Sequence, residues 1–288
     1  MTETHTLEVP GATIVYDVHG PLPPTDGRPP LMLIAQPMDA SGFAALTPHF
    51  ADRTVVTYDP RGLGRSTRKD GHTDQTPDQQ AADVHAIVEA LGAGPVELFA
   101  SSGGAVTALA LVVAHPGDVT TLVAHEPPLL RMIPDAERAL AAERAVQAAY
   151  HADGWGAGMA AFIALTSWQG EFTDEFAARP LPAPEQFGMP ADDDGTRTDP
   201  LLSGASNAIT AYWPNIDALT AAPTRIVVAA GIESKDMLTW RTAQALAERL
   251  GTSLEVFPSH HGGFMGGEFG YAGEPEAFAA RLREVLRS

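Results

Sequence analysis

Ser102 is the residue of this chain whose surroundings most clearly predict chemistry. It follows an apolar run and lies in the order Ala100-Ser101-Ser102-Gly103-Gly104, among residues with little or no side chain. A serine with tiny residues two places before and two places after it fits a tight strand-turn-helix elbow. Such an elbow exposes the serine hydroxyl at the carboxyl edge of a sheet. An ordinary Gly/Ser turn has the same composition, so the rest of the chain must decide.

A serine hydroxyl becomes a useful nucleophile only when a nearby base takes its proton. Two adjacent histidines, His260 and His261, follow the last predicted strand in a loop bounded by Pro258 and Gly262-Gly263. A metal site is the alternative for this pair, but the sequence offers no third ligand beside it. We therefore expect a base here, with no metal and no cofactor.

A catalytic histidine is usually held by an acid that fixes its tautomer and stabilises its protonated form. Three acids stand where a strand ends. Glu126 follows the predicted strand 120–124, while Glu233 and Asp236 follow the predicted strand 225–230. The residues alone do not decide which of these three acids holds the histidine.

Alternating strands and helices predict the framework that carries these groups. Apolar runs at 31–35, 54–58, 96–100 and 225–230 are typical of strands buried on both faces. Helical periodicity predicts helices at 77–91, 239–250 and 275–286. The first two predicted strands of the chain are expected to form a hairpin. The expected fold class is α/β, with about eight strands in a mostly parallel sheet and helices on both faces. Ligands bind at the carboxyl ends of such strands, where Ser102 and Glu126 lie.

One long segment interrupts the alternation. Residues 129–215 hold helical stretches and three of the four tryptophans. We expect a helical cap there, inserted into a core of residues 1–128 and 216–288. Met38, Trp168 and Trp213 are candidate substrate-binding residues, and an aromatic lining suits an apolar or aromatic substrate.

The composition limits the kinds of partner that the protein can bind. Eighteen basic against thirty-six acidic residues give a net charge of −18, which argues against nucleic acid and anionic membranes. The sequence shows neither a signal peptide nor an apolar stretch of roughly 20 residues. We expect a cytoplasmic protein that acts on a small molecule, and leave a homodimer open.

Four features in order resemble the α/β-hydrolase family over nearly the whole chain. They are the loop Ala35-Gln36-Pro37-Met38, the stretch Asp59-x-Arg61-Gly62-x-Gly64-x-Ser66, the Ser102 elbow and the late histidine pair. The resemblance implies that Ser102 is a nucleophile and that the Asp59 stretch is a structural turn. It also favours His261 as the base over His260, because the family's histidine is followed within a few residues by an aromatic, here Phe264.

A local resemblance bears on the acid. Ser101-Ser102-Gly103 together with His125-Glu126-x-Pro128 is similar to the zearalenone lactone hydrolases, whose acid is a glutamate after this earlier strand. It implies Glu126 as the acid, with Glu233 and Asp236 as alternatives.

An oxyanion hole needs two backbone N–H groups. Gly103, directly after the nucleophile, supplies one at a helix N-terminus. The second comes from the loop after Ala35, where Pro37 has no N–H, so we choose Gln36 and keep Met38 as the alternative. The expected activity is hydrolysis of a carboxylic ester or lactone. The alternatives are a cofactor-free perhydrolase resembling haloperoxidases or a C–C bond hydrolase on the same residues, and a ligand-binding relative without turnover.

Overall fold

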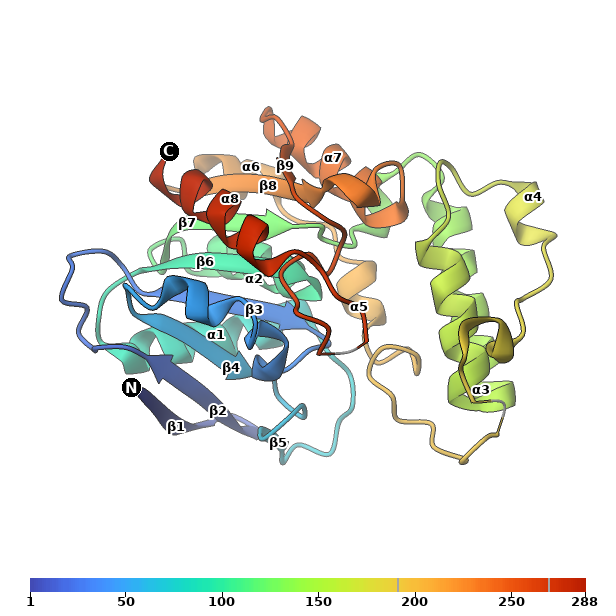
Figure 1. Cartoon of the computed structure of the whole chain (residues 1–288), viewed down its shortest axis with the longest axis horizontal. Coiled ribbons are helices and arrows are strands. Elements are labelled where there is room, and N and C mark those ends of the chain that lie inside the picture. The colour runs from blue at the N-terminus through green and yellow to red at the C-terminus, as the bar shows by residue number, and fades with distance from the viewer. Residues whose placement is uncertain (191, 269) are drawn as a thin grey trace.

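A single twisted sheet forms the body of the protein. The computed structural model describes residues 1–190, 192–268 and 270–288. Within these ranges the sheet has nine strands, of which eight pair in the order β1-β2-β4-β3-β6-β7-β8-β9 (Figure 1). The ninth is β5 (Thr67–Arg68), a two-residue strand that pairs with β2 and that the sequence pattern did not predict.

The sheet is antiparallel at one edge and parallel elsewhere. β1 (Thr2–Val9) and β2 (Ala12–His19) form the predicted hairpin, and β2 also runs antiparallel to β4 (Val55–Asp59). The remaining strands pair in parallel, so their carboxyl ends lie at one edge: β3 (Leu31–Gln36), β6 (Val96–Ser102), β7 (Val119–His125), β8 (Arg225–Gly231) and β9 (Glu255–Phe257).

Helices cover both faces of the sheet. One face packs against α1 (Pro77–Leu91), α2 (Gly103–Ala114) and α7 (Leu238–Leu250). The other packs against α8 (Pro275–Arg287) and two short 3-10 turns, η1 (Ala40–Phe43) and η2 (Thr47–Phe50). The segment up to Phe50 thus forms 3-10 turns and not an α-helix. Pro48 interrupts it, because proline has no N–H for a helical bond.

A second, helical body follows β7. The chain runs through η3 (Leu130–Met132), α3 (Ala136–Thr166), α4 (Asp174–Ala177), η4 (Pro184–Phe187) and α5 (Asn207–Thr210), then returns through α6 (Ile216–Ala221) to β8. In Figure 1, α3 and α4 stand beside the sheet rather than on its faces. This body has its own core, which includes Tyr150, Phe172 and Leu202 and is joined by Leu238 of α7.

Candidate active site

Ser102 ends β6 on a strained turn. Its φ of 56° and ψ of −131° lie outside the regions that residues other than glycine prefer, and α2 begins at the next residue. The turn needs a residue without a side chain at Gly104, where a Cβ atom would lie 2.6 Å from the Cα of Ala35. The elbow geometry thus agrees with the expectation from the small residues around Ser102.

Glu126 lies one residue beyond β7, completely buried and with a φ of 48°. Its Oε1 accepts a hydrogen bond from the backbone N–H of Gly231 at 2.9 Å, and its Oε2 accepts one from the Thr239 hydroxyl at 2.5 Å. Burial alone would raise the pKa of Glu126, but the charge and hydrogen bond of His261, together with the smaller effects of His125 and of the Thr239 hydrogen bond, outweigh burial and lower the pKa to about 2. The carboxylate is therefore ionised at neutral pH.

His261 reaches Glu126 from the loop after β9. Its Nδ1 lies 2.6 Å from the Oε2 of Glu126, a hydrogen bond between residues 135 positions apart. His261 is partly exposed, whereas its buried neighbour His260 is engaged elsewhere. The Nδ1 of His260 accepts from the Gly262 N–H, its Nε2 lies 2.9 Å from the Ala272 carbonyl oxygen, and its ring stacks on Tyr271.

The other two candidate acids do not join this group. Glu233 and Asp236 are both exposed, and within the described part of the chain no hydrogen bond or ion pair links either carboxylate to a histidine. The structure thus brings Glu126 and His261 together and leaves Glu233 and Asp236 at the surface.

The contact between Ser102 and His261 is not closed in this conformation. Among the hydrogen bonds of the described residues, none joins the Ser102 hydroxyl to the imidazole. Such bonds are often long in enzymes without bound substrate and tighten in the complex, so this gap does not exclude the pair.

The two expected oxyanion donors flank the elbow. Gly103 is the first residue of α2, so its N–H has no partner within the helix. Gln36 ends β3 as the register partner of Ser102, and its carbonyl oxygen lies 3.0 Å from where a Cβ of Gly103 would be. The side-chain amide of Gln36 is buried, and neither its oxygen nor its nitrogen has a hydrogen-bond partner among the described residues.

The expected substrate residues lie at different places. Met38 packs against the core on the α8 side of the sheet. Trp168 packs within the helical body, with Phe176 at its edge and the Arg179 guanidinium 4.4 Å from its ring centre. Trp213 is about half exposed, beside Arg249 of α7. None of these three is in a described side-chain hydrogen bond, ion pair or ring contact with Ser102, Glu126 or His261.

The polar stretch after β4 forms a structural turn. The Asp59 carboxylate accepts from the N–H of Ala40 and from Arg65, and the Ser66 hydroxyl donates to the Asp59 carbonyl at 2.6 Å. Arg61 is buried and donates through two nitrogens to Asp83. These bonds tie the turn to its surroundings, as expected for a structural role.

Comparisons with known proteins agree with this architecture. A family model described as the alpha/beta hydrolase fold matches residues 34–163. An uncharacterized hydrolase of Bacillus subtilis, YraK, is 27% identical over 293 residues, covering 98% of this chain and 95% of its own. A thermophilic esterase from Thermogutta terrifontis superposes with a TM-score of 0.65 at 21% identity, over 99% of this chain and 98% of its own. An enzyme described as degrading N-acyl homoserine lactone superposes with a TM-score of 0.61 at 21% identity, over 98% and 99% of the two chains.

This chain has the α/β-hydrolase fold. In this hydrolase fold the Ser102 elbow, Glu126 and the His261 loop all lie at the carboxyl edge of the parallel strands, as the sequence pattern led us to expect. No helix in residues 1–190, 192–268 and 270–288 combines the length and apolar character needed to cross a membrane.

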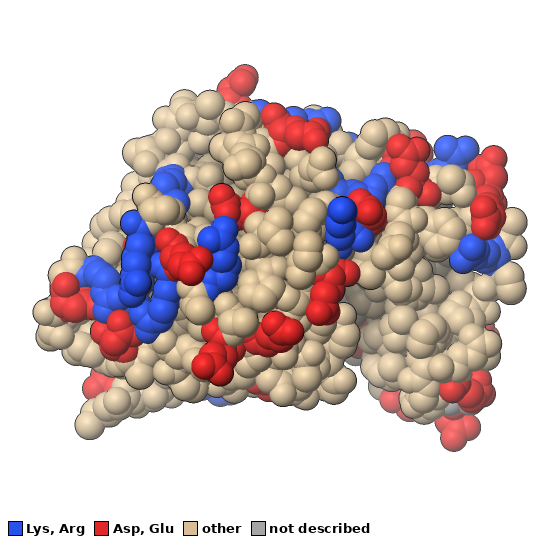
Figure 2. All heavy atoms as spheres, turned by 45° about the horizontal axis from the view of Figure 1, so that its top comes forward, with Lys and Arg blue, Asp and Glu red and all other residues tan. Residues whose placement is uncertain are grey.

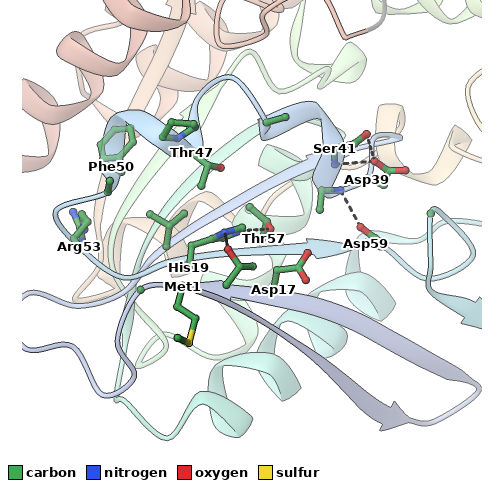
Figure 3. Close-up of a pocket in the computed structure, with 18 of the residues that line it drawn as sticks. Met1, Asp17, His19, Asp39, Ser41, Thr47, Phe50, Arg53, Thr57 and Asp59 are labelled. Atoms are coloured by element: carbon green, nitrogen blue, oxygen red, sulfur yellow. Dashed lines mark hydrogen bonds between the residues drawn. The ribbon is translucent and has the colours of Figure 1, made fainter.

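A cavity of about 720 Å³ lies away from these residues. It opens between β2, β4 and the turns η1 and η2, and Figure 3 shows Asp17, His19, Asp39 and Asp59 around it. Arg65 bridges the carboxylates of Asp17 and Asp59, and the Asp39 carboxylate accepts from the backbone N–H and the hydroxyl of Ser41. Figure 2 shows a separate hollow between the main body and the smaller lobe at the right.

A second histidine cluster lies outside the predicted site. His85, His115 and Asp118 place one potential ligand atom each within 4.8 Å of one another. The two imidazoles stack face to face, 3.6 Å apart and 10° from parallel. Since lone pairs lie in the ring plane, parallel rings direct them side by side rather than at one common ion.

The sequence pattern missed three residues around Glu126. Gly231 and Thr239 donate to its carboxylate, and His125 lies behind it with its ring completely buried. The sequence pattern assigns His125 no role beyond its place in the motif before Glu126. Its position as the last residue of a buried strand, beside the serine before the nucleophile, was the signal available in the sequence.

Proposed function

We propose that this protein is a serine hydrolase of carboxylic esters or lactones, with Ser102 as nucleophile, His261 as base and Glu126 as acid. The observation that carries the proposal is the 2.6 Å contact between His261 Nδ1 and Glu126 Oε2, combined with the strained elbow at Ser102. These groups come from three separate parts of the chain and meet at one sheet edge. The esterase and lactone-degrading relatives of the fold support the same class of reaction.

The reaction begins with proton transfer from the Ser102 hydroxyl to Nε2 of His261. The serine oxygen attacks the carbonyl carbon, and the carbonyl oxygen becomes an oxyanion held by the N–H groups of Gly103 and Gln36, or of Met38 in place of Gln36. The buried, ionised Glu126 stabilises the imidazolium through Nδ1. As the tetrahedral intermediate collapses, the imidazolium gives its proton to the departing alcohol oxygen.

Water completes the cycle. His261 takes a proton from a water molecule, which attacks the acyl-serine carbonyl, and Ser102 leaves with the proton returned from His261. With an ester the alcohol diffuses away in the first half. With a lactone it stays attached to the acyl chain, and the product is a hydroxy acid.

The substrate is proposed to be apolar or aromatic and to bind between the main body and the helical body. Partly exposed aromatic side chains of the helical body, Trp155 and Trp168, support this choice. Zearalenone, an aromatic lactone, is the specific candidate that follows from the local resemblance around Ser102 and Glu126.

The decisive experiment compares wild type and Ser102→Ala on p-nitrophenyl acetate and zearalenone, together with labelling by a fluorophosphonate. We expect the variant to lose at least about 10³-fold in kcat, and the label to map by mass spectrometry to Ser102 rather than to the adjacent Ser101. Equal rates in the two proteins would remove Ser102 as the nucleophile. Failure of Ser102 to react with the fluorophosphonate would favour a ligand-binding relative without turnover.

A further inference from the structure

His125 is a fully buried histidine directly behind Glu126. Its ring centre lies 5.3–6.5 Å from the ring centres of four phenylalanines, namely Phe99, Phe257, Phe264 and Phe278. A histidine is an unusual choice for such a cage, because burying its polar nitrogens costs free energy unless they find partners. The hydrogen-bond partners of the two ring nitrogens therefore indicate the role of His125.

Within the described part of the chain, one nitrogen of His125 is in a hydrogen bond and the other is not. Its Nδ1 lies 3.1 Å from the hydroxyl oxygen of Ser101, which is its register partner on β6. Its Nε2 is buried and has no hydrogen-bond partner among the described residues. It lies 4.0 Å from Oε1 of Glu126.

The ionised carboxylate decides which nitrogen carries the proton. A lone pair on Nε2 would face the negative charge of Glu126, whereas an N–H there directs its positive end toward that charge. Nδ1 then has the free lone pair, and the Ser101 hydroxyl must be the donor. We propose that Ser101 and His125 are positioning residues. The Ser101 hydroxyl donates to Nδ1 of a neutral His125, and the N–H at Nε2 of His125 points toward Glu126.

The surroundings keep His125 uncharged. Burial, and to a smaller extent the nearby charges of His261 and His260, lower its pKa to about 4, against the opposing effect of Glu126. Tyr271 stacks on the neighbouring His260; burial and the charges of Glu233 and Glu126 raise the pKa of Tyr271, so it too is neutral at pH 7. His125 therefore acts as a fixed dipole and not as a second base.

The consequence for catalysis rests on the proposed function. Oε1 of Glu126 takes the Gly231 N–H and faces the His125 N–H, which leaves Oε2 for His261. The positive end of the His125 N–H dipole partly offsets the negative charge of the Glu126 carboxylate, and that charge stabilises the protonated form of His261. Removing the dipole should therefore raise the pKa of His261 and move the acid limb of kcat/KM to higher pH.

The tautomer is tested without any activity measurement. Nitrogen-15 NMR of histidine-labelled Ser102→Ala protein should show His125 with its hydrogen on Nε2 at pH 7 and no titration above about pH 5. Adding Ser101→Ala should shift the Nδ1 resonance, whereas Ser101→Thr, which keeps a hydroxyl, should shift it less. A hydrogen on Nδ1, or titration of His125 near pH 6.5, overturns the proposal.

The dipole is tested with His125→Phe, which suits the aromatic cage. The pKa of His261 by NMR, and the acid limb of kcat/KM for p-nitrophenyl acetate, should rise by roughly half a pH unit. A residue that only fills space would change kcat or the melting temperature and leave this pKa in place, and that result, or a fall in the pKa, overturns the proposal. If Ser102 proves not to be the nucleophile, the proposed function fails while the NMR pKa still tests this inference.

Discussion

Arg241 of α7 donates hydrogen bonds to both carboxylate oxygens of Asp135, the residue directly before α3. The same guanidinium donates to the carbonyl of Gly170, and Asp135 also accepts from the N–H of Phe172. One ion pair therefore fastens both the start of α3 and the chain that follows its end to the main body. Both partners are largely buried.

Breaking this pair should loosen the helical body. Arg241→Met leaves the Asp135 carboxylate buried without its cation, and we expect a loss of about 3 kcal/mol in the free energy of unfolding. Limited proteolysis should cut first within 129–215. The exposed pair Arg138–Asp174 is the control, and Arg138→Met should cost under about 1 kcal/mol. Equal losses in the two variants would contradict an anchoring role for Arg241.

Glu126 is expected to be the acid of the site. Glu126→Gln keeps the shape of the side chain but removes the charge that stabilises the His261 imidazolium, so kcat/KM should fall by about 10³- to 10⁴-fold. Glu233→Gln and Asp236→Asn should stay within about tenfold of wild type, because both carboxylates are exposed. Steady-state kinetics on one ester decides the question, and the opposite ranking would reassign the acid.

The buried amide of Gln36 should cost stability. Neither of its polar atoms has a hydrogen-bond partner among the residues that the structure describes, so Gln36→Met should raise the free energy of unfolding by about 1–3 kcal/mol, as measured by denaturant titration. Gln80 is the matched control: it is equally buried, donates to Gln75 and accepts from Thr107. Gln80→Met should destabilise the protein, and loss of stability in both variants would show that Gln36 is satisfied in solution.

Stability should fall as the pH drops from about 6.5 to 4, in part because of His125. Its pKa is about 4 in the folded state against 6.5 for an unperturbed histidine, so in this window the unfolded chain binds the proton and the folded chain does not. At pH 5 this costs about 2 kcal/mol relative to pH 7. Denaturant titrations at both pH values should show a smaller loss for His125→Phe, and an unchanged loss would mean that His125 is not held neutral.

The elbow should tolerate no side chain at Gly104. In Gly104→Ala the new methyl would lie 2.6 Å from backbone atoms of β3, which cannot rotate away, so we expect at least about 3 kcal/mol of destabilisation. Gly117→Ala is the control, because a Cβ there meets nothing within 4 Å. Melting temperatures that fall equally would argue against close packing of α2 on β3.

Local patterns were enough to predict most of the fold. The continuous apolar runs predicted the buried strands, and helical periodicity predicted α1 with the bounds that the structure shows, because both patterns depend on residues close in sequence. The two-residue β5 was missed because pairing with β2, not its own composition, makes it a strand.

The site divides in the same way. The sequence alone determined that the segment around Ser102 can form a tight elbow, because small neighbours and their spacing are local properties; the strained backbone of Ser102 shows that it does. The residues alone left open which of His260 and His261 contacts which of the three candidate acids. The choice of His261 and Glu126 depended on family resemblance. Only the tertiary structure decided that Glu126 and His261 are in contact and that Ser101 meets His125. Those contacts depend on strand order and register, which bring together side chains up to 135 positions apart.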